Sequence, residues 1–179
     1  ATLRPMRIVI VGAGLAGSLL ATMLARQGHQ IVLCERRGDP RRAGYSGGRS
    51  INLAISKRGI AALSRIGLDQ AVLAEAVRMP GRMIHGLDGQ RVYQPYSADP
   101  DRAINSVSRG GLTLALLRAA EKEPGIAMHF GRRCVAVDFE QGAVDFAGED
   151  GAASREQGDL VVAADGAYSV VRSILQKTE

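Results

Sequence analysis

Three continuous apolar runs mark strands that we expect to be buried on both faces. They span Arg7–Val11, Gln30–Cys34 and Leu160–Ala164. Strands of this composition are typical of a parallel sheet covered on both sides, whereas a strand with one solvated face alternates apolar and polar residues. Between the first two runs, apolar residues recur at helical spacing, and Gly28 is placed to end the helix. The pattern therefore predicts a β-α-β unit at the N-terminus.

Beyond this unit, the pattern changes to short helices and strand pairs. Helices are expected at 57–66, 69–77, 112–122 and 169–176, with Asp69 as the N-cap of the second. Residues 82–87 and 90–94 predict a hairpin with a type I′ turn at Asp88-Gly89. Residues 103–108 and 126–130 are expected to be extended, and 134–139 with 143–146 to form another hairpin. The Gly/Arg-rich connection from 36 to 48 lacks periodicity and predicts a loop.

These elements together predict an α/β fold, namely a Rossmann-like parallel sheet with an inserted β-meander. The chain has 179 residues with 46% hydrophobic content, which suits one sizeable α/β domain. We expect residues 1–179 to form a single dinucleotide-binding domain, within which 80–108 contributes to a ligand pocket.

The first predicted strand ends in a glycine-rich turn. Gly12 would permit a tight turn, Gly14 would let backbone amides approach a pyrophosphate, and Gly17 would allow close packing of the helix on the sheet. Glu35, at the end of the second strand, could accept the hydrogens of both ribose hydroxyls, and an acid there disfavours a 2′-phosphate. The motif predicts a site for FAD or NAD, with a purely structural glycine turn as the alternative.

Asp165 follows the third apolar run, at the carboxyl end of its strand. Ligands of open α/β sheets bind at these ends, so the side chain is expected to face the same crevice as Glu35 and the glycine turn. Its alternative role is to cap the helix at 169–176.

Charge and composition exclude several other classes. The net charge is +5, but the arginines are scattered, whereas a nucleic-acid surface would concentrate them. No apolar run approaches the length of a membrane span, so a cytoplasmic protein without a membrane segment is expected. Cys34 and Cys134 lack the spacing of a zinc site, and we expect neither a metal nor a disulfide.

Residues 48–59, with the sequence GRSINLAISKRG, give the chain a more specific relationship. This stretch is similar to the signature of the kynurenine 3-monooxygenase family of FAD-dependent aromatic hydroxylases. The resemblance continues in that family's order and spacing through segments 83–85, 95–96, 106–109 and 165–169. It implies an FAD domain joined to part of a substrate-domain hairpin.

The resemblance implies a set of FAD-binding positions and a substrate clamp. The cofactor positions, apart from Gly12, Gly14 and Gly17, are Leu15, Ala16, Glu35, Arg36, Arg37, Ala54, Arg109, Cys134 and Asp165. Cys134 would contribute backbone groups near the adenine, so its thiol need not be reactive. Arg82 and Tyr96 would hold the carboxylate of the substrate.

The implied reaction is hydroxylation of L-kynurenine to 3-hydroxykynurenine with NADPH and O₂, in tryptophan degradation and NAD biosynthesis. It assigns no catalytic residue to the chain, because the cofactor carries the difficult chemistry. A hydroxylase of another aromatic acid and a non-catalytic FAD- or NAD-binding module remain as alternatives.

Strand geometry and residue type alone suggest other roles for several of these residues. A turn at Asp88-Gly89 would place residue 82 opposite 95, and strict pleating would then send Arg82 and Tyr96 to opposite faces. The clamp would require a register break at Pro95. Without the resemblance, an exposed arginine and a core tyrosine are favoured, and Arg109 suits a surface ion pair.

Members of this family are well over twice as long as the chain. We therefore expect an N-terminal portion that folds its Rossmann-like core but does not turn over alone. Its exposed apolar surface would favour self-association into a homo-oligomer.

Overall fold

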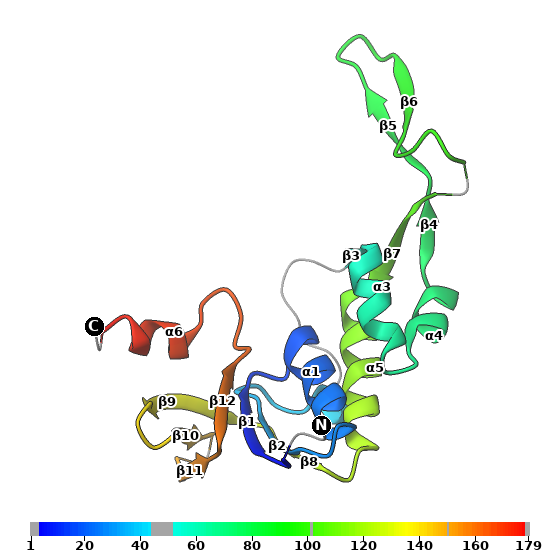
Figure 1. Ribbon diagram of the computed structural model, residues 1–179. Coiled ribbons are helices and arrows are strands. Elements are labelled where there is room, and N and C mark those ends of the chain that lie inside the picture. Colours follow the sequence, from blue (N-terminus) through cyan, green and yellow to red (C-terminus); the bar gives the residue numbers. More distant parts are fainter. Residues whose placement is uncertain (1–3, 44–51, 101, 150, 178–179) are drawn as a thin grey trace. The chain divides into compact units, whose positions relative to one another are not determined.

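The chain divides into two compact units. The computed structural model describes residues 4–43, 52–100, 102–149 and 151–177. The first unit comprises Ala1–Ser46 with Thr113–Glu179, and the second comprises Gly47–Leu112 (Figure 1). The expectation of one FAD-binding domain, with 80–108 contributing to a substrate pocket, remains a prediction.

A four-stranded parallel sheet organises the first unit. Its order is β12-β1-β2-β8. These strands are β1 (Arg7–Val11), β2 (Gln30–Cys34), β8 (Ile126–His129) and β12 (Leu160–Ala163). The three apolar runs thus form adjacent parallel strands, which confirms the predicted parallel sheet.

Helices cover one face of this sheet. Ile8 and Ile10 point from β1 into a buried cluster with Ala21 of α1 (Leu15–Ala25) and Leu117 of α5 (Arg109–Glu121). Gly28 takes a positive φ of 89° just beyond α1, and its N–H donates to the carbonyl of Ala25. The predicted helix and its glycine stop are confirmed.

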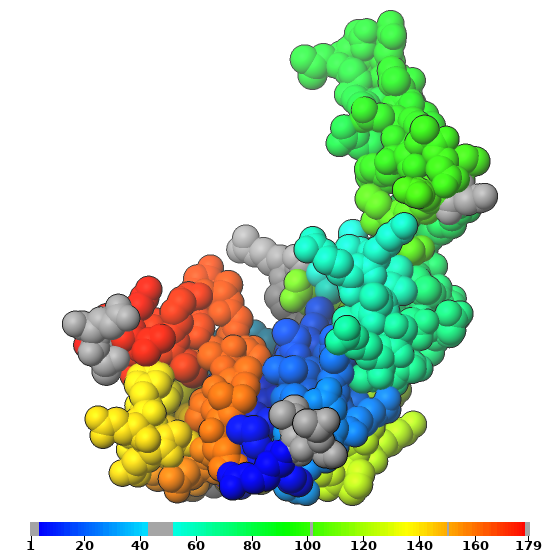
Figure 2. All heavy atoms as spheres, in the orientation of Figure 1, coloured from blue at the N-terminus to red at the C-terminus, as the bar shows by residue number. Residues whose placement is uncertain are grey.

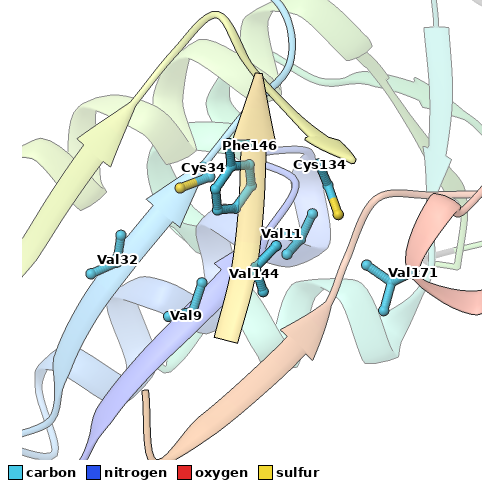
Figure 3. Close-up of a cluster of buried hydrophobic side chains, with 8 residues drawn as sticks. All are labelled: Val9, Val11, Val32, Cys34, Cys134, Val144, Phe146 and Val171. Atoms are coloured by element: carbon cyan, nitrogen blue, oxygen red, sulfur yellow. The ribbon is translucent and has the colours of Figure 1, made fainter. Parts of the chain in front are cut away.

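An antiparallel meander covers the other face. It consists of β9 (Arg132–Asp138), β10 (Ala143–Gly148) and β11 (Ala153–Gln157), with β10 in the middle. Val9 and Val11 of β1 meet side chains of the meander and Val171 of α6 (Val170–Leu175) in a second buried cluster (Figure 3). The predicted meander is confirmed, although the sequence analysis missed β11.

The second unit contains a smaller antiparallel sheet with two helices. Its strands are β3 (Asn52–Ile55), β7 (Ile104–Ser108) and β4 (Val77–Met79), with β7 in the middle. The helices are α3 (Lys57–Ser64) and α4 (Asp69–Ala74). Residues 52–59 of the signature stretch therefore build β3 and the start of α3, while 48–51 lie outside the described residues.

Two predictions about α4 were wrong. Its N-cap is Leu68, without a side-chain cap, and Asp69 is the first helical residue, where its charge complements the helix dipole. Val77 does not extend the helix but pairs with Ser106 in the sheet. A β-branched residue beside an available strand is more stable in that sheet than at a helix end.

The connection expected to be a loop contains a short helix, α2 (Pro40–Ala43). Asp39 precedes it and accepts hydrogen bonds from the backbone N–H and the guanidinium of Arg41. The side-chain hydrogen bond from Arg41 lowers the pKa of Asp39. Residues 44–48 of this connection lie outside the described residues.

The hairpin of β5 (Gly81–His85) and β6 (Arg91–Pro95) differs from the prediction at its turn. A type I′ turn needs positive φ at both central residues, but only Gly89 has one, at 82°. The N–H of Gly89 donates to the carbonyl of Gly86, and that of Gly86 to the carbonyl of Gln90. This bulged turn is one residue longer than expected, so Arg82 stands opposite Gln94 and the predicted register was wrong.

No helix in the described ranges combines the length and apolar character needed to cross a membrane.

Candidate functional site

The turn after β1 lies against the end of β12. Gly12 has a φ of 105°, and a Cβ there would lie 2.5 Å from the carbonyl oxygen of Ala164 and 2.9 Å from the Cα of Asp165. The N–H of Gly12 donates to the carbonyl of Cys34 at 2.7 Å. Only glycine suits both this positive φ and the short distance to the backbone of β12. The absence of a side chain at Gly12 therefore lets the turn lie directly against Asp165.

Gly17 lets α1 approach the same point. A Cβ at this position would collide with the carbonyl oxygen of Gly12 and lie 3.2 Å from the Cβ of Ala164. The predicted close helix-to-sheet packing is therefore observed, and it brings the start of α1 to the carboxyl ends of β1 and β12.

Gly14 has a different environment. A Cβ placed on it would meet no atom of the described residues within 4 Å. Gly14 is the N-cap of α1 and supplies no side-chain cap, and the first turn, which begins with Leu15 and Ala16, contains no acidic residue. An uncapped helix start with open space beside it is suited to an anionic group such as a pyrophosphate.

Glu35 is held beside this turn by backbone hydrogen bonds. One carboxylate oxygen accepts from the N–H of Ala13 at 3.0 Å, and the other from the N–H of Arg37 at 3.1 Å. Each carboxylate oxygen can accept a second hydrogen bond. The side chain thus links the glycine turn to the end of β2 and keeps acceptor capacity for ribose hydroxyls.

Asp165 caps a helix with one carboxylate oxygen and keeps the other available to a ligand. Its Oδ2 accepts from the N–H groups of Val170 and Val171, at 2.7 and 3.3 Å, at the start of α6. Its Oδ1 is buried and has no hydrogen-bond partner among the described residues. A buried carboxylate oxygen without a donor is costly, and a ligand hydroxyl or N–H would satisfy it.

Arg36 and Arg37 follow Glu35 and are both exposed. No ion pair of the described residues involves either guanidinium. The backbone of this segment is fixed by Gly131 and Arg132, whose N–H groups donate to the carbonyls of Arg37 and Glu35. Two unpaired cations beside the glycine turn are suited to the phosphate side of a dinucleotide.

Cys134 lies on β9, an edge strand of the meander. Its side chain is 7% exposed and packs in the cluster that also contains Cys34 (Figure 3). Burial, reinforced by the negative charges of Asp165 and Asp145, raises the pKa of the Cys134 thiol to about 11. Burial is also the main cause that raises the pKa of Cys34 to about 12. Both thiols are therefore protonated at neutral pH, and any role of Cys134 falls to its backbone.

The other expected site residues belong to the second unit. Ala54 is exposed on β3, opposite Ser106 of β7. Arg109 is the first residue of α5, where Ser108 accepts a hydrogen bond from the N–H of Gly111. Their contact with a flavin remains a prediction.

The hairpin places Arg82 and Tyr96 on one face, contrary to the expectation of opposite faces. Arg82 is paired with Gln94, and the N–H of Tyr96 donates to the carbonyl of Pro80 at 3.0 Å, which continues the same register. Residues 94 and 96 alternate back to the same side of the strand. No break at Pro95 is needed, and Tyr96 is 46% exposed rather than in the core.

The residues of the first unit fit a dinucleotide such as FAD. They supply an open approach to Gly14, uncapped amides at the start of α1, spare acceptor capacity on Glu35 and a buried, unsatisfied oxygen on Asp165. These features gather at the carboxyl ends of three parallel strands, where ligands of such sheets bind.

A family model described as "FAD binding domain" matches residues 6–178 of this sequence. The chain belongs to this FAD-binding family. Structures with the same fold include p-nitrophenol 4-monooxygenase PnpA from Pseudomonas putida, at 20% identity and a TM-score of 0.77 over 94% of this chain and 42% of that one. A tetrameric 2-methyl-3-hydroxypyridine-5-carboxylic acid oxygenase matches at 20% identity and a TM-score of 0.75, over 97% of this chain and 43% of that one.

Curated relatives confirm the resemblance found in the sequence. Kynurenine 3-monooxygenase of Myxococcus xanthus is 47% identical over 171 residues, which cover 95% of this chain and 37% of the relative. The enzyme of that name from Salinispora tropica is 46% identical over 175 residues, covering 97% of this chain and 39% of the relative. The chain thus spans less than two-fifths of the length of these relatives.

Replacement of Gly17 by alanine tests the close packing of α1. Because the new methyl group would collide with backbone, we expect Gly17→Ala to lower the free energy of unfolding by about 3 kcal/mol. Chemical denaturation followed by circular dichroism measures the loss. Gly38→Ala is the control, since a Cβ at Gly38 meets nothing within 4 Å, and equal stability of the two variants would contradict the packing argument.

Replacement of Gly14 by alanine separates binding from folding. Gly14 has an extended conformation, with φ −72° and ψ −172°, that alanine adopts readily. We expect an unchanged unfolding midpoint but FAD affinity lowered by at least about tenfold, because the methyl group occupies the approach to the helix amides. Titration of apoprotein with FAD, followed by flavin fluorescence, measures this, and unchanged affinity would place the pyrophosphate elsewhere.

Thiol reactivity tests the burial of the two cysteines. Because both pKa values are raised from 9.0 to about 11 or 12, the native thiols should react with Ellman's reagent at pH 8 about 100-fold more slowly than in denatured protein. Rapid labelling of Cys134→Ser or Cys34→Ser in the native state would show that the remaining thiol is accessible.

Proposed function

We propose that this chain provides the FAD site and part of the substrate site of a flavoprotein monooxygenase that converts L-kynurenine to 3-hydroxykynurenine. The observation that carries the proposal is the open glycine turn flanked by Glu35 and Asp165. It occurs in a chain that is 44 to 47% identical to proteins named kynurenine 3-monooxygenase. The reaction would serve tryptophan degradation and NAD biosynthesis, with NADPH as reductant.

The cofactor would be held mainly by backbone groups. We assign the pyrophosphate to Gly14 and the amides of Leu15 and Ala16, and a ribose to Glu35. Arg36 and Arg37 would surround the ADP half, the Cys134 backbone would hold the adenine, and Asp165 would use its Oδ1. Ala54 and Arg109 of the second unit would complete the flavin end. Bound FAD, reduced by NADPH, would supply the oxygen activation that no side chain provides.

The substrate carboxylate would bind Arg82 and Tyr96. Their shared face on the hairpin supports this assignment, because a guanidinium and a phenol hydroxyl can donate to one carboxylate only from the same side. Both side chains are exposed. Arg82 takes part in no ion pair of the described residues, so its charge is available to a ligand.

The proposed function is tested in two steps. First, the purified 179-residue chain should bind FAD and show the absorbance bands of a bound flavin. Second, the full-length gene product should oxidise NADPH in response to L-kynurenine and form 3-hydroxykynurenine, detected by mass spectrometry. A flavin-loaded, full-length protein that forms no 3-hydroxykynurenine would contradict the substrate assignment, and a chain without flavin affinity would contradict the cofactor site.

Loss of the Arg82 guanidinium should selectively impair substrate binding. We expect Arg82→Ala in the full-length gene product to raise the KM for L-kynurenine about 100-fold while flavin content stays unchanged. Kynurenine-stimulated NADPH oxidation gives the KM. Arg91→Ala is the matched control, since Arg91 pairs with His85 on the opposite hairpin face. If Arg82→Ala leaves kynurenine-stimulated NADPH oxidation unchanged, a hydroxylase of another aromatic acid is favoured.

A further inference from the structure

A third polar residue shares the hairpin face of Arg82 and Tyr96. Gln94 stands directly opposite Arg82 and two residues before Tyr96, so the three side chains share one face of the hairpin. The next pair toward the turn on this face, Ile84 with Val92, is apolar, so the three polar residues lie together at the end of the hairpin away from the turn. All three are exposed, and the hairpin is drawn in green in Figure 2.

Gln94 makes a specific contact with Arg82. Its Oε1 accepts a hydrogen bond from Nε of the guanidinium at 2.8 Å. A guanidinium is planar, so fixing Nε fixes the plane of the two terminal nitrogens. Those terminal nitrogens form no ion pair among the described residues. They are therefore left as an oriented donor pair.

The neutral character of Gln94 is as important as its position. A carboxylate at 94 would neutralise Arg82 and repel an anionic ligand, whereas an amide oxygen orients the guanidinium without cancelling its charge. The acid in the hairpin, Asp88, is used within the turn, where its Oδ1 accepts from the N–H of Gln90. No acid within the hairpin therefore pairs with Arg82.

We propose that Gln94 is a positioning residue for substrate recognition, acting through Arg82. It holds the guanidinium so that both terminal nitrogens face one carboxylate, and Tyr96 donates from the same side. Gln94 thereby selects ligands that carry a carboxylate over those that lack it. This assignment rests on the proposed function and adds a residue to it that neither the sequence motif nor the resemblance supplied.

The test compares two ligands in the FAD-loaded, full-length gene product. L-Kynurenine carries the carboxylate, and kynuramine is the same molecule without it. Affinities are measured from the change in flavin absorbance on binding. In Gln94→Leu, which removes the acceptor, we expect affinity for L-kynurenine to fall about tenfold and affinity for kynuramine to change less than about twofold. The KM should rise in parallel while kcat is preserved.

Gln94→Glu gives a second and distinct expectation. Its carboxylate would pair with Arg82, so L-kynurenine should bind more weakly than in Gln94→Leu, even though an acceptor is restored. A purely structural role would predict rescue by glutamate instead. Gln90→Leu is the matched control, because Gln90 is an exposed glutamine in the same hairpin, away from Arg82, and it should bind both ligands as wild type does.

The outcomes separate this assignment from the proposed function. Equal weakening of both ligands in Gln94→Leu, or full rescue by Gln94→Glu, would overturn the positioning role while leaving kynurenine binding by the wild type intact. A flavin-loaded wild type that fails to bind L-kynurenine would overturn the proposed function, and the role of Gln94 with it. Flavin content equal to wild type shows that each variant is folded.

Discussion

A close approach of backbone segments in the first unit supports both its fold and the proposed site. The turn at Gly12, the start of α1 at Gly17 and the end of β12 at Ala164 meet where a single Cβ would cause overlap. If α1 moved outward to relieve such an overlap, Ala21 would leave the cluster with Ile8 and Ile10. The helix amides would move with it, away from Glu35 and Asp165. The packing of α1 and the proposed binding of a pyrophosphate thus depend on the same absence of side chains.

Glu35 and Asp165 spend part of their hydrogen-bonding capacity on the protein backbone and keep part of it unused. Glu35 accepts one backbone N–H at each oxygen, which holds the turn against β2 and fixes the carboxylate in place. Asp165 uses one oxygen to bind the amides that start α6 and leaves the other buried and unsatisfied. An acid immobilised in this way loses little rotamer entropy when it binds a ligand hydroxyl. A structural role of these two carboxylates is therefore compatible with the proposed ligand-binding role.

Sequence patterns predicted the elements whose signal lies within their own residues. The apolar runs of β1, β2 and β12 and the glycine turn between β1 and α1 carry their signals locally, and all were recovered. The strand β11 was missed because its sequence, ASREQ, has no apolar alternation. It is held by pairing with β10 and by ion pairs of Arg155 with Asp145 and of Glu156 with Arg7. Such cross-strand partners are separated along the chain and cannot be read from a local window.

The hairpin shows how the geometry of one turn determines which side chains share a face. Asp88-Gly89 suits a two-residue turn, but the chain instead forms a turn over residues 86–89 in which only Gly89 takes a positive φ. This choice avoids the cost of a left-handed conformation at Asp88. It also shifts the register by one residue, and because side chains alternate with a period of two, the shift moves Tyr96 to the face of Arg82. The residue that then stands opposite Arg82 is Gln94, an uncharged acceptor, rather than Pro95. The turn geometry thus determines which neighbour orients the guanidinium.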